Sequence, residues 1–214
     1  MKQELIDDGW INDRAYPVCN ADENGVPHRS LGMTVVYRAW YNMRERCTSR
    51  KLKEKYPTYI GVSASAEFKN FTLFHQWWYS QLGYDLPNVE LDKDLLNKGN
   101  KVYSPETCLL IPKFVNMFLV KRDAARGDCM IGVDKKGAYK NGDTRYRTRV
   151  SEYDPTTGKS VLKHLGYFHN ELDAFHVYKS AKEAIAKKYA DYLSGKVDSR
   201  VIDALLNFEV NIND

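Results

Sequence analysis

Long apolar runs and paired cysteines are missing from this sequence of 214 residues. No apolar run reaches the length of about 18 residues that a membrane-spanning helix needs, so we expect no contact with a membrane. The opening stretch, MKQELIDDGW, lacks the apolar segment of a signal peptide, which predicts that the chain stays in the cytoplasm where it is made. The cysteines form no CxxC pair and have no histidine at zinc-finger spacing, so we expect reduced, mostly buried thiols. They are Cys19, Cys47, Cys108 and Cys129.

A strong excess of one charge sign is also missing. Lys and Arg total 32, Asp and Glu total 28, and the formal net charge is +4. This balance permits binding to nucleic acid without requiring it, so the distribution of the charge must decide. The hydrophobic fraction of 43% and the charged fraction of 28% indicate a folded chain of one or two domains, with no internal repeats.

Helical periodicity begins at Thr34, after a polar arm over residues 1–33. Basic side chains are dense along this first predicted helix, and either a solvated helix face or contact with phosphate explains them. Arg44 and Arg46 are the candidates for gripping a DNA backbone. A second helix is expected from about Ser65, where aromatic residues at helical spacing indicate a core rather than base stacking. Its apolar face is expected to contain Phe68, Phe71, Phe74, Trp77, Trp78 and Leu82.

Three β-type runs follow Cys129: MIGVDKK, RYRTRVSEYD and KSVLKHLGYF, separated by the turn sequences KNGD and PTTGK. Asn170 is a suitable N-cap for a helix directly after the third run, and small apolar residues along that helix suit close packing against a sheet. A short helix is expected in VDSRVIDALLNF. We therefore expect an α+β fold that contains a three-stranded antiparallel sheet backed by one helix.

Three arginines of the middle run are expected to share one face of this sheet, because side chains alternate along a strand. They are Arg145, Arg147 and Arg149. Like charges side by side are unfavourable on a solvated sheet, and arginine suits guanine edges and phosphates. We expect this face to contact DNA, with an ordinary exposed strand as the alternative. The lysines expected to join the arginines are Lys135, Lys136 and Lys163.

The same region resembles the ethylene-response-factor type of DNA-binding domain over about residues 129–188. The resemblance is carried by IGVDKKGAYK, a basic second strand and LGYFHNELDAFHVYKSAKEAI. In that family a three-stranded antiparallel sheet enters the major groove while a helix backs the sheet. The resemblance implies that Lys135 and the three arginines meet DNA. It places the junction between sheet and helix at Leu165, Gly166 and Phe168.

The stretch Glu90–Asn116, ELDKDLLNKGNKVYSPETCLLIPKFVN, indicates a strand, a loop, a strand and a helix. Asp92 ends the first expected strand, and Asn116 lies on the expected helix. Two oxygen ligands from these places would leave most of a Mg²⁺ shell to water and a DNA phosphate, as that ion prefers. A hairpin without a metal is the alternative.

This stretch is similar to the HNH endonucleases, specifically the homing-type enzymes common in bacteriophages. LDKDLLNKGNKVYSPETCLLI carries the resemblance, together with the upstream YRAWYNMRERC and YPTYIGVSASAEFKNFTLFHQW. Such enzymes commonly carry the sheet-type DNA-binding domain after the nuclease core. The resemblance implies a ββα-metal core that holds one Mg²⁺ or Mn²⁺ through Asp92 and Asn116.

Two positions depart from the family pattern. Lys93 stands where the family has its general-base histidine, and Thr107 stands at the middle asparagine. A lysine is ordinarily protonated at pH 7 and accepts a proton only when strongly desolvated. Lys93 is therefore a candidate for a residual base or for a clamp on phosphate charge, while metal-bound water would supply the nucleophile.

Three functions follow from these patterns. The leading hypothesis is a metal-dependent homing or nicking endonuclease that cuts double-stranded DNA, in a bacterial host cytoplasm if a phage encodes it. The second is a catalytically degenerate DNA-binding protein that acts as a regulator or as an inhibitor of a host defence or DNA-acting system. The third is a factor that blocks a host protein through the arginines. The expected parts are an arm (1–33), a nuclease core (34–128), a DNA-binding domain (129–190), and a C-terminal helix and tail (191–214).

Overall fold

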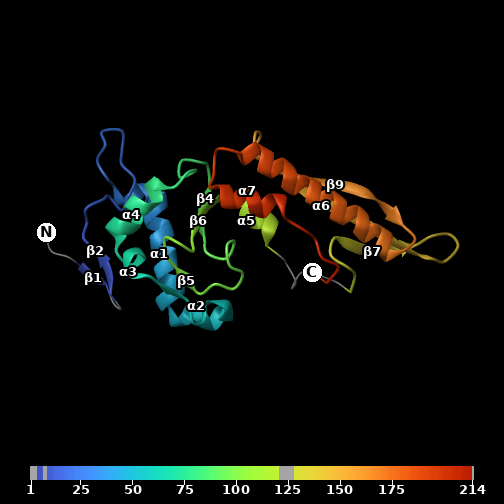
Figure 1. Ribbon diagram of the computed structural model, residues 1–214, viewed down its shortest axis with the longest axis horizontal. Helices are drawn as coiled ribbons and strands as arrows, with labels where there is room; N and C mark the ends of the chain where they lie inside the picture. Colours follow the sequence, from blue (N-terminus) through green and yellow to red (C-terminus); the bar gives the residue numbers. More distant parts are fainter. Residues whose placement is uncertain (1–3, 7–8, 121–127, 214) are drawn as a thin grey trace. The chain divides into compact units, whose positions relative to one another are not determined.

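The computed structural model describes residues 4–6, 9–120 and 128–213 of a mixed α+β chain (Figure 1). The chain forms two compact units: unit 1 comprises residues 1–113 and 196–200, and unit 2 comprises residues 114–195 and 201–214. The sequence analysis placed the boundary between the nuclease core and the DNA-binding domain after residue 128, next to residues 121–127, which lie outside the described residues. Within the described ranges, no helix has both the length and the apolar character needed to cross a bilayer.

The first helix of unit 1 begins where the sequence predicted it. α1 spans Val35–Thr48, and the side chain of its N-cap Thr34 accepts a hydrogen bond from the backbone N–H of Tyr37 at 3.2 Å. The apolar stripe is buried as expected, at Val36, Trp40 and Met43. α2, Arg50–Lys55, follows after a single residue.

The second predicted helix is present in two pieces, α3 (Ala66–Lys69) and α4 (Phe71–Ser80). The break occurs at Asn70, which has an extended backbone and caps α4 by accepting a hydrogen bond from the N–H of Leu73 at 3.2 Å. The expectation that Leu82 lies on the buried face is wrong, because α4 ends at Ser80 and the Leu82 side chain is 54% exposed. The buried members of the stripe are Phe68, Phe71, Phe74 and Trp78.

Short strand pairs complete unit 1. β4 and β6 are antiparallel, with Val89 opposite Pro112 and Asp92 opposite Leu109. β3 and β5 are parallel, and β1 and β2 are antiparallel. The strand bounds are β1 Glu4–Ile6, β2 Trp10–Asn12, β3 Ser63–Ala64, β4 Val89–Asp92, β5 Val102–Tyr103 and β6 Leu109–Pro112. Two 3-10 turns occur at Arg29–Leu31 and Pro57–Tyr59.

The core of unit 1 is mainly aromatic. Trp10, from the segment expected to be a loose arm, is 1% exposed, and its ring lies 5.4 Å from that of Trp40 in an edge-on arrangement. The indole N–H of Trp40 donates to the backbone carbonyl of Phe68 at 2.8 Å, which satisfies its polar atom inside the core. These aromatics therefore stabilise the fold, which the sequence analysis expected of Phe68 but not of Trp10.

Unit 2 contains the predicted three-stranded antiparallel sheet in the order β7-β8-β9. The strands are β7 Val133–Ala138, β8 Thr144–Asp154 and β9 Lys159–Phe168. The register shifts twice, between Lys135 and Ala138 of β7 and opposite Thr148 and Arg149 of β8. The second shift leaves Leu165 of β9 without an opposite residue, as in a β-bulge.

One long helix, α6, Glu171–Leu193, packs against this sheet (Figure 1). The predicted N-cap Asn170 accepts a hydrogen bond from the backbone N–H of Asp173 at 2.7 Å. The packing face was expected to consist of small apolar side chains, but it contains aromatic rings as well, and one of the small residues, Ala184, is exposed. The buried residues are Ala174, Phe175, Tyr178, Ile185, Ala186, Tyr189, Ala190 and Leu193.

Two further helices belong wholly or largely to unit 2: α5, Lys113–Leu119, and the predicted short helix α7, Ser199–Leu206. The ring of Phe114 on α5 stacks on Tyr153 at 4.9 Å and meets Tyr189 of α6 edge-on at 5.0 Å. These contacts explain why the chain divides at the start of α5 rather than after it.

Candidate functional site

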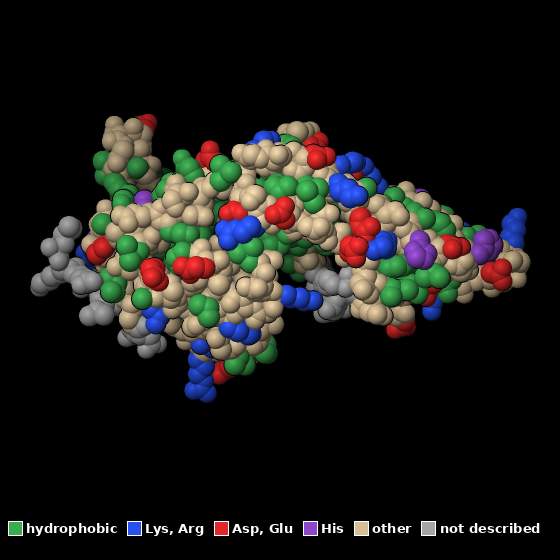
Figure 2. All heavy atoms as spheres, in the orientation of Figure 1, with side chains coloured by type: hydrophobic (Ala, Val, Ile, Leu, Met, Phe, Trp, Pro, Cys, Tyr) green, Lys and Arg blue, Asp and Glu red, His purple; other side chains and the backbone are tan. Residues whose placement is uncertain are grey.

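The three arginines of β8 lie on the sheet face opposite α6, as predicted. Thr148 and Val150 alternate with them and are 0% and 3% exposed on the helix side. We call the opposite side, which carries Arg145, Arg147 and Arg149, the arginine face. Figure 2 shows one side of unit 2, over which acidic and basic side chains are interspersed.

An acidic residue that the sequence analysis did not single out lies among these arginines. Asp134 of β7 is directly opposite Arg147 of β8. The guanidinium of Arg147 donates from Nε to Oδ1 at 3.1 Å and from Nη2 to Oδ2 at 2.7 Å, a two-pronged ion pair. Arg149 Nη2 lies 3.9 Å from the same carboxylate. The hydrogen bonds from Arg147 hold the pKa of Asp134 below its usual range despite partial burial.

Aromatic rings accompany the arginines on β9. Arg145 donates from Nε and Nη2 to the Lys136 carbonyl at 3.2 and 3.0 Å, and its guanidinium carbon lies 4.7 Å from the centre of the Tyr167 ring. The rings of Tyr167 and His164 are 4.7 Å apart. Tyr167 is opposite Arg147 and His164 is opposite Arg149, so both belong to the arginine face. The face thus combines cations, rings and one carboxylate.

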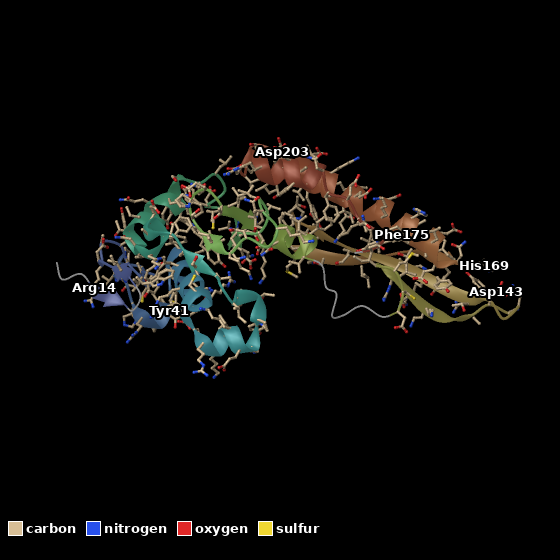
Figure 3. All side chains as sticks on the ribbon, turned by 60° about the horizontal axis from the view of Figure 1, so that its bottom comes forward. Arg14, Tyr41, Asp143, His169, Phe175 and Asp203 are labelled. Atoms are coloured by element: carbon tan, nitrogen blue, oxygen red, sulfur yellow. The ribbon has the colours of Figure 1, made fainter. Side chains whose placement is uncertain are left out.

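The hairpin end of this sheet is braced by its own contacts. Figure 3 shows Asp143 and His169 side by side at the outer end of the sheet, where His169 Nδ1 lies 3.6 Å from Asp143 Oδ2. The His169 ring also stacks on Tyr139, with 4.0 Å between ring centres. The β7–β8 turn is therefore tied to the end of β9.

The placement of two lysines on the arginine face is wrong. Lys163 is opposite Val150 and ion-paired with Glu152, on the side that α6 covers. Because Leu165 forms a bulge, every β9 residue before it points to the opposite side of the sheet from the side that an unbroken register would give. Lys135 is opposite Tyr146 and so also lies on the α6 side. Lys136 lies within the irregular part of β7 and contributes its carbonyl to Arg145.

The basic residues proposed to grip DNA from α1 are largely turned inward. Arg46 donates from Nη1 to the hydroxyl of Tyr103 at 3.1 Å and lies over the Tyr59 ring at 5.6 Å. Arg44 is half-buried, and its Nε is enclosed with no hydrogen-bond partner among the described atoms. Exposed Arg50 pairs with Glu54 one turn later. Arg46 therefore serves to join α1 to β5 within unit 1.

Asp92 closes the turn that follows β4. Its Oδ1 accepts hydrogen bonds from the backbone N–H groups of Asp94 at 2.9 Å and Leu95 at 2.7 Å. Burial raises the pKa of this carboxyl, and the two N–H groups oppose that rise only in part. Both bonds use Oδ1, so the geometry is compatible with a metal ligand at the other oxygen but is fully explained by an Asx turn.

Lys93 is a buried structural residue. Its side chain is 10% exposed, and its ammonium donates to Asp94 Oδ1 at 2.6 Å and to the Asn100 carbonyl at 2.7 Å. The same nitrogen lies 5.8 Å from the centre of the Tyr103 ring. Asn100 in turn donates to the Lys93 carbonyl at 3.0 Å. Lys93 thus closes the loop, because its ammonium is directed at Asp94 and at the Asn100 carbonyl.

The structure places Asn116 on a helix, as predicted, and Thr107 in a turn. Asn116 lies in α5, in unit 2, whereas Asp92 belongs to unit 1. Thr107 donates to the Val102 carbonyl at 2.7 Å and helps form the turn that begins at Ser104. Across the part of the chain that the structure describes, no three His, Cys, Asp or Glu side chains gather where they could hold a metal ion.

The cysteines are free thiols, as expected. Only Cys108 is fully buried, and the other three are partly exposed. Burial raises the pKa of Cys47 to about 11 and that of Cys108 to about 12, so both remain protonated and unreactive near neutral pH.

Comparisons of this chain with protein-family models, with curated proteins and with solved structures gave no match.

The sequence contained a signal for the acidic residue that was overlooked. Asp134 lies within the predicted run MIGVDKK, and the alternation of faces along a strand allows it on the same side as the arginines. Its exact partner depended on the register between β7 and β8. That register places Asp134 opposite Arg147, which is 13 positions away in the sequence.

Proposed function

We propose that this protein binds double-stranded DNA through the arginine face of unit 2. The observation that supports the proposal is the row of three arginines on the sheet side away from α6, flanked by Tyr167 and His164. Asp134 offsets one of the three positive charges, so the row retains an excess of positive charge. Such a row would repel itself in isolation, and phosphate or guanine acceptors would relieve that repulsion.

The shape of the element agrees with this proposal. The major groove of B-form DNA admits a narrow β-ribbon, and arginine is the side chain best suited to guanine because its fork matches two acceptors. The resemblance to the ethylene-response-factor type of domain points to the same face. Arg145 and Arg149 suit phosphate contacts beside it, which would set the position of the sheet along the duplex.

Replacing Arg147 with alanine is expected to weaken duplex binding by about 1–3 kcal/mol if this side chain reads a base. Binding would be measured by fluorescence anisotropy at fixed salt, on duplexes selected from a random-sequence library. Arg145→Ala should instead weaken binding to all duplexes and reduce the salt dependence by about one phosphate contact, if it contacts the backbone.

Lys163→Ala is the matched control for both variants. It removes the same charge from the same sheet but from the α6 side, where Glu152 retains a second partner in Lys188. Its affinity should stay close to that of the unchanged protein. Equal losses for Lys163→Ala and Arg147→Ala would show that only net charge matters and would refute the arginine face as the contact surface.

The second candidate is a metal-dependent endonuclease of HNH type acting on the bound DNA. What favours it is the antiparallel β4–β6 pair followed at once by α5, together with a partly buried carboxylate, Asp92, at the end of β4. If a Mg²⁺ or Mn²⁺ ion binds, the Asp92 carboxylate of unit 1 would hold it, and the resemblance names Asn116 on α5 as its second ligand. The ion would supply an activated water, and Lys93 would contribute only loop rigidity.

Nicking of supercoiled plasmid in Mn²⁺ tests this second candidate. If it is correct, cutting requires the metal and disappears in Asp92→Asn, while duplex binding remains or tightens because one negative charge is lost. Asp85→Asn, at an exposed carboxylate shortly before β4, is the control and should cut normally. If plasmid nicking is equal in the unchanged protein, Asp92→Asn and Asp85→Asn and does not depend on the metal, the nuclease is ruled out.

The outcomes also separate the remaining hypotheses. Duplex binding without cutting would support a DNA-binding protein that regulates or competes with a host DNA-acting or defence system. Absence of duplex binding would leave the arginine face as a docking surface for an acidic protein partner.

A further inference from the structure

The ion pair between Asp134 and Arg147 has an unusual setting, because it lies at the centre of a face that otherwise gathers positive charge. Both partners extend from paired strands and are directly opposite each other. The Arg147 side chain is only 16% exposed, whereas Arg149 is 39% exposed. Arg147 is therefore less exposed than Arg149, and the ion pair with Asp134 holds its guanidinium in place.

The ion pair with Asp134 occupies only some of the N–H donors of the Arg147 guanidinium. Nε donates to Oδ1 and Nη2 to Oδ2, so the carboxylate occupies the side edge of the guanidinium. An arginine side chain has five N–H donors in a planar fork. The outer edge has one N–H on each of Nη1 and Nη2, and this pair matches the O6 and N7 acceptors of guanine. The Tyr167 side chain, opposite Arg147 on β9, also hydrogen-bonds this guanidinium.

We propose that Asp134 is a positioning residue that fixes Arg147 to read a guanine in the major groove. This inference rests on the proposed DNA binding. Holding the guanidinium plane in place before contact reduces the side-chain freedom that binding would otherwise remove. The carboxylate also repels phosphates, so it lowers affinity for DNA that offers no guanine at this position.

Asp134→Asn separates these two effects because it removes the charge at nearly constant shape. If Asp134 positions Arg147, the variant binds an unrelated duplex a few-fold more tightly yet loses discrimination at the guanine. If Asp134 only offsets charge, the variant binds every duplex more tightly and keeps its discrimination. The two explanations therefore predict different ratios of the two affinities: positioning predicts that the ratio falls, and charge offset alone predicts that it stays the same.

The experiment begins with selection of a preferred duplex by the full chain from a random-sequence library. Dissociation constants are then measured at fixed salt for that duplex and for duplexes with each G·C pair changed in turn to A·T. We expect one guanine at which the unchanged protein discriminates by about 5–150-fold. In Asp134→Asn this ratio should fall to within about 3-fold, and Arg147→Ala should lose the same ratio at the same position.

Arg147→Lys provides a second variant in case Asp134→Asn folds poorly. It keeps a positive charge beside Asp134 but removes the planar fork, so discrimination at the guanine should again be lost while salt dependence is retained. Full discrimination in either Asp134→Asn or Arg147→Lys would overturn the inference while leaving DNA binding intact. Absence of duplex binding by the unchanged protein would instead refute the proposed function itself, and the inference with it.

Discussion

Gly132→Ala is expected to destabilise unit 2 by about 2–5 kcal/mol, the sum of backbone strain and overpacking. Gly132 has φ +77°, a conformation that alanine adopts only with strain. A Cβ at this position would lie 2.2 Å from the ring of Tyr178 on α6. The carbonyl of Gly132 also accepts a hydrogen bond from Thr148 Oγ1 at 2.8 Å, so the residue joins β8 to the segment before β7.

Gly137→Ala is the matched control. Gly137 has φ +79°, but a Cβ there would meet nothing within 4 Å, so only the strain remains. Far-UV circular dichroism during urea unfolding would measure both variants, and tryptophan fluorescence would follow unit 1 separately because all four tryptophans lie in it. Equal destabilisation by the two substitutions would show that the Tyr178 ring moves aside at little cost. Duplex binding should fall with the folded fraction of Gly132→Ala, because the arginine face requires the intact sheet.

Lys93→Met is expected to destabilise unit 1 by about 2–4 kcal/mol, since removing one partner of a buried ion pair leaves other groups unsatisfied. The Asn100 carbonyl would lose its charged donor, and Asp94 would lose its partner. Asp94 is 52% exposed and can be rehydrated, which keeps the cost below that of a fully buried pair. Methionine preserves the length and apolar stem of the side chain, so the change isolates the ammonium.

The shift would be read from tryptophan fluorescence in urea, with Lys98→Met as the control. Lys98 is an exposed lysine of the same loop and should change stability by less than about 0.5 kcal/mol. If Lys93→Met unfolds like the unchanged protein, the ammonium does not hold the loop. A role for Lys93 in phosphate chemistry would then regain support.

Local sequence determined most of the secondary structure. The helical spacing of Val36, Trp40 and Met43 predicted α1, and Asn170 began α6 because its side chain caps the first turn. The alternation of β8 and its turn sequences predicted the three-stranded sheet. These features depend on residues a few positions apart, so the sequence carries them directly. The order of strand, strand and helix around Asp92 was predicted in the same way.

Only the tertiary structure decided what the functional side chains contact. A bulge at Leu165 moved Lys163 to the α6 side, and the β7–β8 register brought Asp134 to Arg147. Periodicity within one strand does not specify its register with the neighbouring strand. A shift of one residue moves every side chain of the shifted strand to the other side of the sheet. Lys93 likewise found its partner in the Asn100 carbonyl across a loop. A long, flexible cation can make such a contact or extend into solvent, and the choice depends on burial that the whole fold creates.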